Sequence, residues 1–249
     1  MKDIYNHIIE SISKGKKLLA VLIDPDKMAT ENVADFIRKV NTSIATHIFV
    51  GGSLVKEYQT QLIVEEIKKY TILPVVIFPG DVSQISRNAD ALLFLSLISG
   101  RNPDYLIGKH VDAVAKLKNS DLEIIPTGYL LIENGKETSV QKVTKTLPLN
   151  RNDSNKIVNT ARAGELLGMK LIYLEAGSGA THAVNSEIIS KVKHNIQIPL
   201  IVGGGIQNIE QLELVYNSGA DLVVIGTALE KDTSLFNDLI QQKSFEWIK

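Results

Sequence analysis

The 249-residue chain contains no cysteine, which excludes disulfide bonds, thiolate metal sites and a cysteine nucleophile. It has almost no net charge, at -1, and no block of lysine or arginine, so nucleic acid is not an expected partner. No apolar run approaches the length of a membrane span, and the first residues lack the apolar core of a signal peptide. We therefore expect a cytoplasmic protein that makes at most peripheral contact with a membrane.

Length and composition favour a single α/β domain over residues 1–249. The chain is 44% hydrophobic and 22% charged, with a mean hydropathy of +0.06, as in ordinary globular proteins. Neither a linker nor a low-complexity segment divides it.

Short apolar runs recur along the whole chain, and each ends in small, polar or turn-forming residues. The runs are apolar nearly throughout rather than alternating, which is typical of parallel strands covered on both faces. Eight such runs, most followed by a helical pattern, predict a (β/α)8 barrel of the TIM type. The predicted strand segments are 18–24, 47–53, 74–81, 91–99, 122–129, 171–179, 199–206 and 221–229.

Two intervals between these strands are irregular. Only about ten residues, 81–90, separate the third strand from the fourth, which is near the lower limit for a crossover with a helix. We predict that the third helix is missing or replaced by an irregular segment, leaving a gap in the outer ring of helices. The fifth interval carries an additional polar stretch, 134–153, which could cover the top of the barrel or contact another subunit.

Glycines follow the last two strands, at the end of the barrel where active sites of this fold lie. Gly204 and Gly205 end the seventh strand, and Gly226 and Thr227 end the eighth. Glycines at these positions let backbone N–H groups approach a phosphate, although each could simply form a tight turn. A hydroxyl and a further N–H group could come from the loop after the sixth strand, at Ser178 and Gly179.

Oxygen ligands follow the first two strands. Asp24 ends the first strand, and Ser53 ends the second. Mg²⁺ favours a few carboxylates together with phosphate and water, so these residues are candidate ligands. The alternative for Asp24 is a turn in which it hydrogen-bonds its own backbone before Pro25.

The sixth strand ends in a carboxylate, Glu175, beside the predicted phosphate loops. In a partly apolar cavity its pKa should rise, which suits a general base acting on an alcohol. Tyr173 lies two residues earlier and faces the same side of the strand, so it could orient the same substrate. The alternatives are an ion pair for Glu175 and a core aromatic role for Tyr173.

These segments together resemble one known family, the geranylgeranylglyceryl phosphate synthases and their bacterial relatives. The resemblance rests on "LIDPDK" at Leu22, "FVGGS" at Phe49, "YLEAGSGA" at Tyr173, "VGGGI" at Val202 and "VIGTALE" at Val224. They occur in the order and spacing of the family and span most of the chain.

The resemblance implies a prenyltransferase that joins the C3 hydroxyl of sn-glycerol 1-phosphate to an all-trans prenyl diphosphate, with geranylgeranyl diphosphate expected, and releases diphosphate with Mg²⁺. It implies a barrel without a regular third helix and a homo-oligomer, either a dimer or a hexamer. Asp24 and Ser53 would bind Mg²⁺, and Glu175 would take the proton from the hydroxyl. The implied residues for sn-glycerol 1-phosphate are Tyr173, Leu174, Glu175, Ala176, Gly177, Ser178, Gly179, Gly204, Gly205, Gly226 and Thr227.

One departure separates this chain from a branch of the family. That branch has a lysine two residues before the metal-binding aspartate, where this chain has Leu22. The chain therefore resembles the other branch, and its phosphate contacts could differ. Arg101, after the fourth strand, could supply a cation for diphosphate or be a loop charge.

Two other functions remain open on sequence alone. A phosphosugar isomerase or lyase on a phosphate-binding barrel would require a catalytic lysine or a second acid at the strand ends. A non-catalytic protein that binds prenyl lipids or phosphorylated metabolites would keep its ligand affinity without Glu175.

Overall fold

Eight parallel strands form a closed barrel in chain order, as the apolar runs predicted. The computed structural model describes residues 3–231 and 234–242. In the described residues, none of the helices has both the length and the hydrophobicity needed to span a bilayer. That residues 1–249 form one domain stays a prediction. The strands are β1 (Leu18–Ile23), β2 (His47–Val50), β3 (Val75–Ile77), β4 (Ala91–Leu97), β5 (Glu123–Leu131), β6 (Leu171–Glu175), β7 (Leu200–Gly203) and β8 (Leu222–Ile225).

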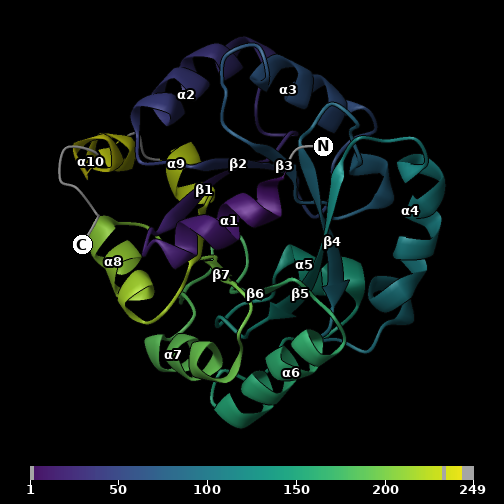
Figure 1. The fold of residues 1–249 in the computed structure, drawn as a ribbon, viewed down its shortest axis with the longest axis vertical. Coiled ribbons are helices and arrows are strands. Elements are labelled where there is room, and N and C mark those ends of the chain that lie inside the picture. The colour runs from purple at the N-terminus through teal and green to yellow at the C-terminus, as the bar shows by residue number, and fades with distance from the viewer. Residues whose placement is uncertain (1–2, 232–233, 243–249) are drawn as a thin grey trace.

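Helices surround the barrel and bury its outer wall (Figure 1). Several begin with a side-chain cap, such as Asn208, which accepts from the Gln211 N–H at 2.9 Å. The helices are α1 (Ile4–Ser13), α2 (Thr30–Thr42), α3 (Gln59–Ile67), α4 (Lys109–Leu117), α5 (Ser139–Thr144), α6 (Ser154–Leu166), α7 (Ser186–Asn195), α8 (Ile209–Asn217), α9 (Thr227–Lys231) and α10 (Ser234–Gln242).

The first helix closes the amino-terminal end of the barrel, a role that the sequence patterns did not indicate. Figure 1 shows α1 lying across the barrel opening, and Ile4 and Ile8 pack against the interior residues. The Glu123 side chain, at the start of β5, accepts hydrogen bonds from the N–H groups of Ile4 and Tyr5. Because this end is closed, ligands must enter from the carboxyl ends of the strands.

The missing helix predicted between the third and fourth strands is confirmed; the helix labelled α3 lies one interval earlier, between β2 and β3. Between β3 and β4 the chain makes only a single 3₁₀ turn, η1 (Val82–Gln84), capped by Asp81. After β4 a short π-helical segment, η2 (Asp104–Gly108), runs directly into α4. The outer wall of β3 and β4 is therefore covered by η1 and the inner face of α4 instead of a regular helix pair.

Two equivalent ion pairs fix the strand starts in opposite halves of the barrel. The Lys68 ammonium lies 2.6 Å from Asp90, whose other oxygen accepts from the Val75 N–H at 2.7 Å. Lys193 lies 2.6 Å from an Asp221 oxygen, and this same oxygen accepts from the Leu200 N–H at 2.8 Å. Each pair joins the helix before one strand to the start of the next strand.

The polar insertion after β5 folds over the carboxyl end of the barrel. The Asn134 side chain donates to the Ala176 carbonyl, and Thr138 begins α5 with a capping box completed by Gln141. The first of the two roles considered for this stretch, covering the top of the barrel, is confirmed.

The buried pair at Asp90 makes a stability prediction. Asp90→Ala removes a carboxylate that is 4% exposed and leaves both the Lys68 charge and the Val75 N–H without this acceptor. We expect unfolding free energy, measured by urea denaturation, to fall by about 3 kcal/mol. The control Asp35→Ala removes an exposed partner of Arg38 and should stay close to wild type. Equal losses in the two variants would contradict this reading.

Candidate active site

Two adjoining cavities open at the carboxyl ends of the strands. The first, called the glycine-rich cavity here, has a volume of about 500 Å³ and contains most of the predicted site residues. The second is an apolar groove between η1, β4 and α4. The glycine-rich cavity is lined, among others, by Asp24, Ser53, Tyr129, Tyr173, Glu175, Gly177, Ser178, Gly179, Gly204, Gly205, Gly226 and Thr227.

Three loops meet closely at the floor of the glycine-rich cavity, and this closeness explains their glycines. Gly204 has φ +85°, and a Cβ there would lie 2.4 Å from a Glu175 oxygen. A Cβ on Gly177, at φ +99°, would lie 2.5 Å from the Thr138 methyl. The loop after β6 joins the loop after β8 through the hydroxyls of Ser178 and Thr227, 2.8 Å apart. The prediction that these loops lie together is confirmed.

A cation lies over the same loops. The ammonium of Lys136, from the insertion, is 3.5 Å from the position that a Cβ of Gly179 would occupy. Together with the backbone N–H groups, this charge makes the cavity favourable for a phosphate. Sequence patterns did not predict a role for Lys136 at this cavity, because its position depends on how the insertion folds back.

Glu175 is a buried carboxylate at the wall of this cavity, with 6% of the residue exposed. One of its oxygens accepts a hydrogen bond of 2.5 Å from the Gly177 N–H. Burial raises the pKa of the Glu175 carboxyl above its ordinary value, and the Gly177 hydrogen bond opposes that shift. No ion pair with Glu175 occurs in the described part of the chain, so the geometry supports a proton acceptor.

Tyr173 lies beneath Glu175 in the barrel interior. Its ring stacks on Phe78 at 5.3 Å between centroids and meets Tyr129 edge-on at 5.4 Å. The Tyr173 hydroxyl is enclosed and makes no hydrogen bond of good geometry within the described residues, although Glu175 is near enough to contribute to the raised pKa of Tyr173. Its role in orienting a substrate stays a prediction.

The residues on either side of Glu175, one in β6 and one just after it, point away from the barrel interior. Leu174 and Ala176 place their side chains in the layer between barrel and helices. Any contribution of Leu174 or Ala176 to ligand binding would therefore come from the backbone.

Asp24 and Ser53 lie together on the rim of the glycine-rich cavity. One Asp24 oxygen accepts from the Asp26 N–H at 3.1 Å, which is the turn considered as the alternative for this residue. The other oxygen lies 2.9 Å from the ammonium of Lys27. Asp24 also packs against Gly52, where a Cβ would lie 3.1 Å from a carboxylate oxygen. The turn and the predicted carboxylate position thus coexist.

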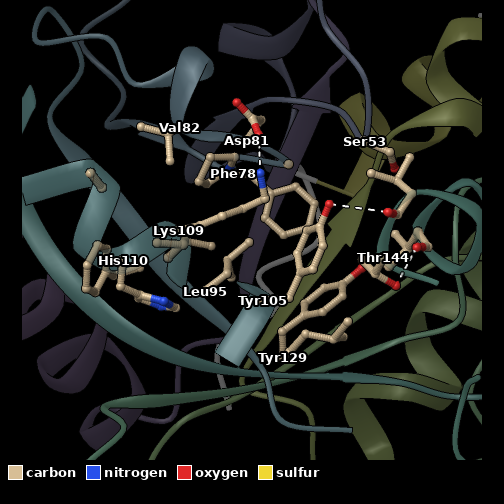
Figure 2. Close-up of a pocket in the computed structure, with 18 of the residues that line it drawn as sticks. Ser53, Phe78, Asp81, Val82, Leu95, Tyr105, Lys109, His110, Tyr129 and Thr144 are labelled. Atoms are coloured by element: carbon tan, nitrogen blue, oxygen red, sulfur yellow. Dashed lines mark hydrogen bonds and ion pairs between the residues drawn. The ribbon is translucent and has the colours of Figure 1, made fainter. Parts of the chain in front are cut away.

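The groove has an apolar wall with one charged pair near its mouth (Figure 2). Lys109 of α4 and Asp81 of η1 form an ion pair across it, drawn as a dashed line in Figure 2. Arg101 lies elsewhere, because its guanidinium donates to the carbonyls of Ile98 and Gly100. The apolar lining includes Phe78, Val82, Ile85, Leu92, Phe94, Leu95, Leu97, Ala113, Val140 and Val143.

Five residues line both the glycine-rich cavity and the groove, so they mark the place where the two meet. Only two of these residues have polar side chains, Ser53 and Tyr129. Tyr129 was missed by the sequence reasoning, although its position at the end of the fifth apolar run, in register with Tyr173, was a usable signal. The five residues are Gly52, Ser53, Phe78, Tyr129 and Val140.

Comparisons with known proteins agree on one family. The model of the PcrB family matches residues 11–243. A geranylgeranylglyceryl phosphate synthase of Flavobacterium johnsoniae is 56% identical, covering 95% of this chain and 98% of the relative. One from Pyrococcus horikoshii is 41% identical, covering 92% and 89%.

A solved structure extends this similarity to three dimensions. The (S)-3-O-geranylgeranylglyceryl phosphate synthase of Thermoplasma acidophilum, in complex with its substrate sn-glycerol-1-phosphate, superposes with a TM-score of 0.89. It is 31% identical, and the match covers 96% of each chain.

The contact between Gly204 and Glu175 makes a prediction about the glycine-rich cavity. We expect inorganic phosphate to raise the melting temperature of the wild type. Gly204→Ala should displace the Glu175 carboxylate and abolish that rise, because the new methyl overlaps a carboxylate oxygen. Gly168→Ala is the matched control, since Gly168 has φ +92° with open space around it. It should lower the melting temperature yet keep the response to phosphate. A normal response in Gly204→Ala would refute the proposed phosphate position.

Proposed function

The chain belongs to the PcrB family, and on that premise we propose that it is a prenyltransferase. It joins the C3 hydroxyl of sn-glycerol 1-phosphate to an all-trans prenyl diphosphate, forming an ether and releasing diphosphate. Geranylgeranyl diphosphate is the expected prenyl donor.

The meeting of the two cavities carries this proposal. The reaction needs one site for a small phosphorylated alcohol and one for a long apolar chain, with their reactive ends in contact. The glycine-rich cavity suits the phosphorylated alcohol, and the groove offers the apolar chain a wall of aliphatic and aromatic side chains. The groove exists because the third helix is replaced by η1.

Glu175 supplies the base. A carboxylate with a raised pKa takes a proton more readily than an ordinary one, which suits activation of a weakly acidic alcohol. The Gly177 N–H fixes one carboxylate oxygen and so orients the other for the substrate. Holding the phosphate of the alcohol on the neighbouring loops aligns its hydroxyl with the prenyl carbon.

Asp24 and Ser53 are proposed to hold Mg²⁺. The described residues contain no cluster of three or more acidic or histidine side chains, so an ion here would complete its shell with phosphate oxygens and water, as Mg²⁺ commonly does. The donor set therefore fits, and Lys27 would have to leave Asp24. When bound, the ion supplies positive charge that stabilises the leaving diphosphate.

The phosphosugar isomerase or lyase is less well supported. Two lysines lie at the glycine-rich cavity: Lys27 is paired with Asp24, and Lys136 comes from the insertion after β5, not from a strand end. Such an enzyme would also have no use for the long apolar groove. The homo-oligomeric assembly and the cytoplasmic location stay predictions, drawn from the resemblance and from composition.

A transfer assay tests the proposal directly. With Mg²⁺, the protein should transfer a radiolabelled prenyl group onto sn-glycerol 1-phosphate. Replacing this acceptor with sn-glycerol 3-phosphate, or adding a chelator, should each abolish the product. The donors should run from farnesyl to heptaprenyl diphosphate, so that the preferred length is found. If no ether forms with any donor, the function is wrong; turnover of a phosphosugar alone would favour the isomerase or lyase.

Substitution of the base gives a second prediction. Glu175→Gln should lower kcat by roughly 100-fold or more, because the amide cannot accept the proton. In the wild type, kcat/KM should fall as the pH drops through a pKa above 4.5, since only the ionised carboxylate is active. That acid limb should be absent from the Gln variant.

The matched control is Glu133→Gln, an exposed glutamate just after β5. Its rate and its pH profile should match those of the wild type. A Glu175→Gln enzyme with near-normal turnover would remove the role of base from this residue.

A further inference from the structure

Tyr129 stands where the reacting ends of the two proposed substrates must meet. Of the residues that line both cavities, Ser53 and Tyr129 alone have polar side chains, and Ser53 is already assigned to the metal. Figure 2 shows Tyr129 among the residues that line the groove, together with Phe78 and Ser53. Its ring lies 5.9 Å from that of Phe78.

The hydroxyl of Tyr129 is available to a ligand. In the described ranges, no protein group hydrogen-bonds to it, whereas the hydroxyl of Tyr105 in the same groove donates to the Val143 carbonyl at 3.4 Å. Both Tyr173 and Tyr129 line the glycine-rich cavity, but the Tyr173 hydroxyl is enclosed, and of the two residues Tyr129 alone also lines the groove. A polar group left in this way at a junction of ligand sites is suited to contact a substrate.

The Tyr129 hydroxyl also keeps its proton. Burial, followed by the nearby charge of Glu175, raises the pKa of Tyr129 well above its ordinary value. It is therefore a hydrogen-bond donor in the neutral pH range, where an ionised Glu175 can accept a proton. Glu175 and Tyr129 lie near each other. The carboxylate can accept a proton, and the phenol can donate a hydrogen bond without losing its proton.

We propose that Tyr129 is a further catalytic residue, whose hydroxyl donates a hydrogen bond to the diphosphate oxygen that leaves the prenyl carbon. This inference rests on the proposed function. The bond between the prenyl C1 and that oxygen breaks, and its electron pair stays on the diphosphate. The C3 hydroxyl oxygen forms the new bond to C1, and its proton goes to Glu175. Tyr129 keeps its own proton throughout.

This role follows from where charge develops. Negative charge on the leaving oxygen is greater in the transition state than in the bound prenyl diphosphate, so a fixed donor there stabilises the transition state more than the bound substrates. The carbon that is attacked becomes more positive in the transition state. The neighbouring aromatic rings of Tyr129 and Phe78 would stabilise that positive charge if the carbon lies over a ring face. Tyr129 thereby acts on the half of the reaction that Glu175 does not reach.

The test is Tyr129→Phe, which removes the hydroxyl and keeps the ring. With the wild type active in the transfer assay, kcat should fall roughly 100-fold, the usual effect of losing one such donor. The dissociation constant for sn-glycerol 1-phosphate, measured by calorimetry, should be unchanged. Tyr5→Phe is the matched control at the closed end of the barrel and should behave as the wild type does.

Each other outcome overturns the proposal in a distinguishable way. A Tyr129→Phe enzyme with wild-type kcat would show that the hydroxyl does not act on the leaving group. Weaker binding of sn-glycerol 1-phosphate with kcat retained would assign Tyr129 to the alcohol site instead. A wild type that forms no ether at all would remove the proposed function, and this inference with it.

Discussion

The burial of one carboxylate at the end of β6 constrains much of the surrounding structure. Glu175 is nearly inaccessible, so the protein must support its charge with the Gly177 N–H. That hydrogen bond requires the loop to turn back at once, and it brings Gly204 so close that a side chain there would overlap the carboxylate. The Ser178–Thr227 contact then holds the third loop to the same floor. The proposed phosphate site and the proposed base thus depend on one set of close contacts.

The two halves of the barrel have equivalent residues at the starts of two pairs of strands. Pro74 and Asp90 lie just before β3 and β4, and Pro199 and Asp221 lie just before β7 and β8. Each aspartate is paired with a lysine at the end of the helix before the first strand of its pair. Pro199 and Asp221 are 22 residues apart, but Pro74 and Asp90 are 16 apart.

The second half has room for α8 and for the glycine loops, whereas in the first half the short turn η1 leaves an apolar groove. The groove and the glycine-rich cavity adjoin because a single barrel carries both variations.

Much of this arrangement could be predicted from the sequence, because it depends on local patterns. The eight apolar runs, the short interval 81–90 and the glycines at 204, 205 and 226 each carry their meaning in a few neighbouring residues. The glycine-lined floor followed, since the ends of parallel strands in a barrel must meet.

The features that were missed depend on contacts between distant segments. The plug formed by α1 needs Glu123, more than a hundred residues away, and the position of Lys136 needs the insertion to fold back. Tyr129 was visible as a tyrosine at a strand end, yet its importance comes from a groove that only the tertiary structure defines.

The central claim is that the two substrates react where the two cavities join. A crystal structure of the protein with sn-glycerol 1-phosphate and an unreactive thiodiphosphate analogue of the prenyl donor tests it most directly. We expect the phosphate on the loops at Gly177 and Gly204, the prenyl chain in the groove, and the C3 hydroxyl within about 3.5 Å of the prenyl C1. A prenyl chain bound outside the groove, or a prenyl C1 far from Glu175 and Tyr129, would contradict it.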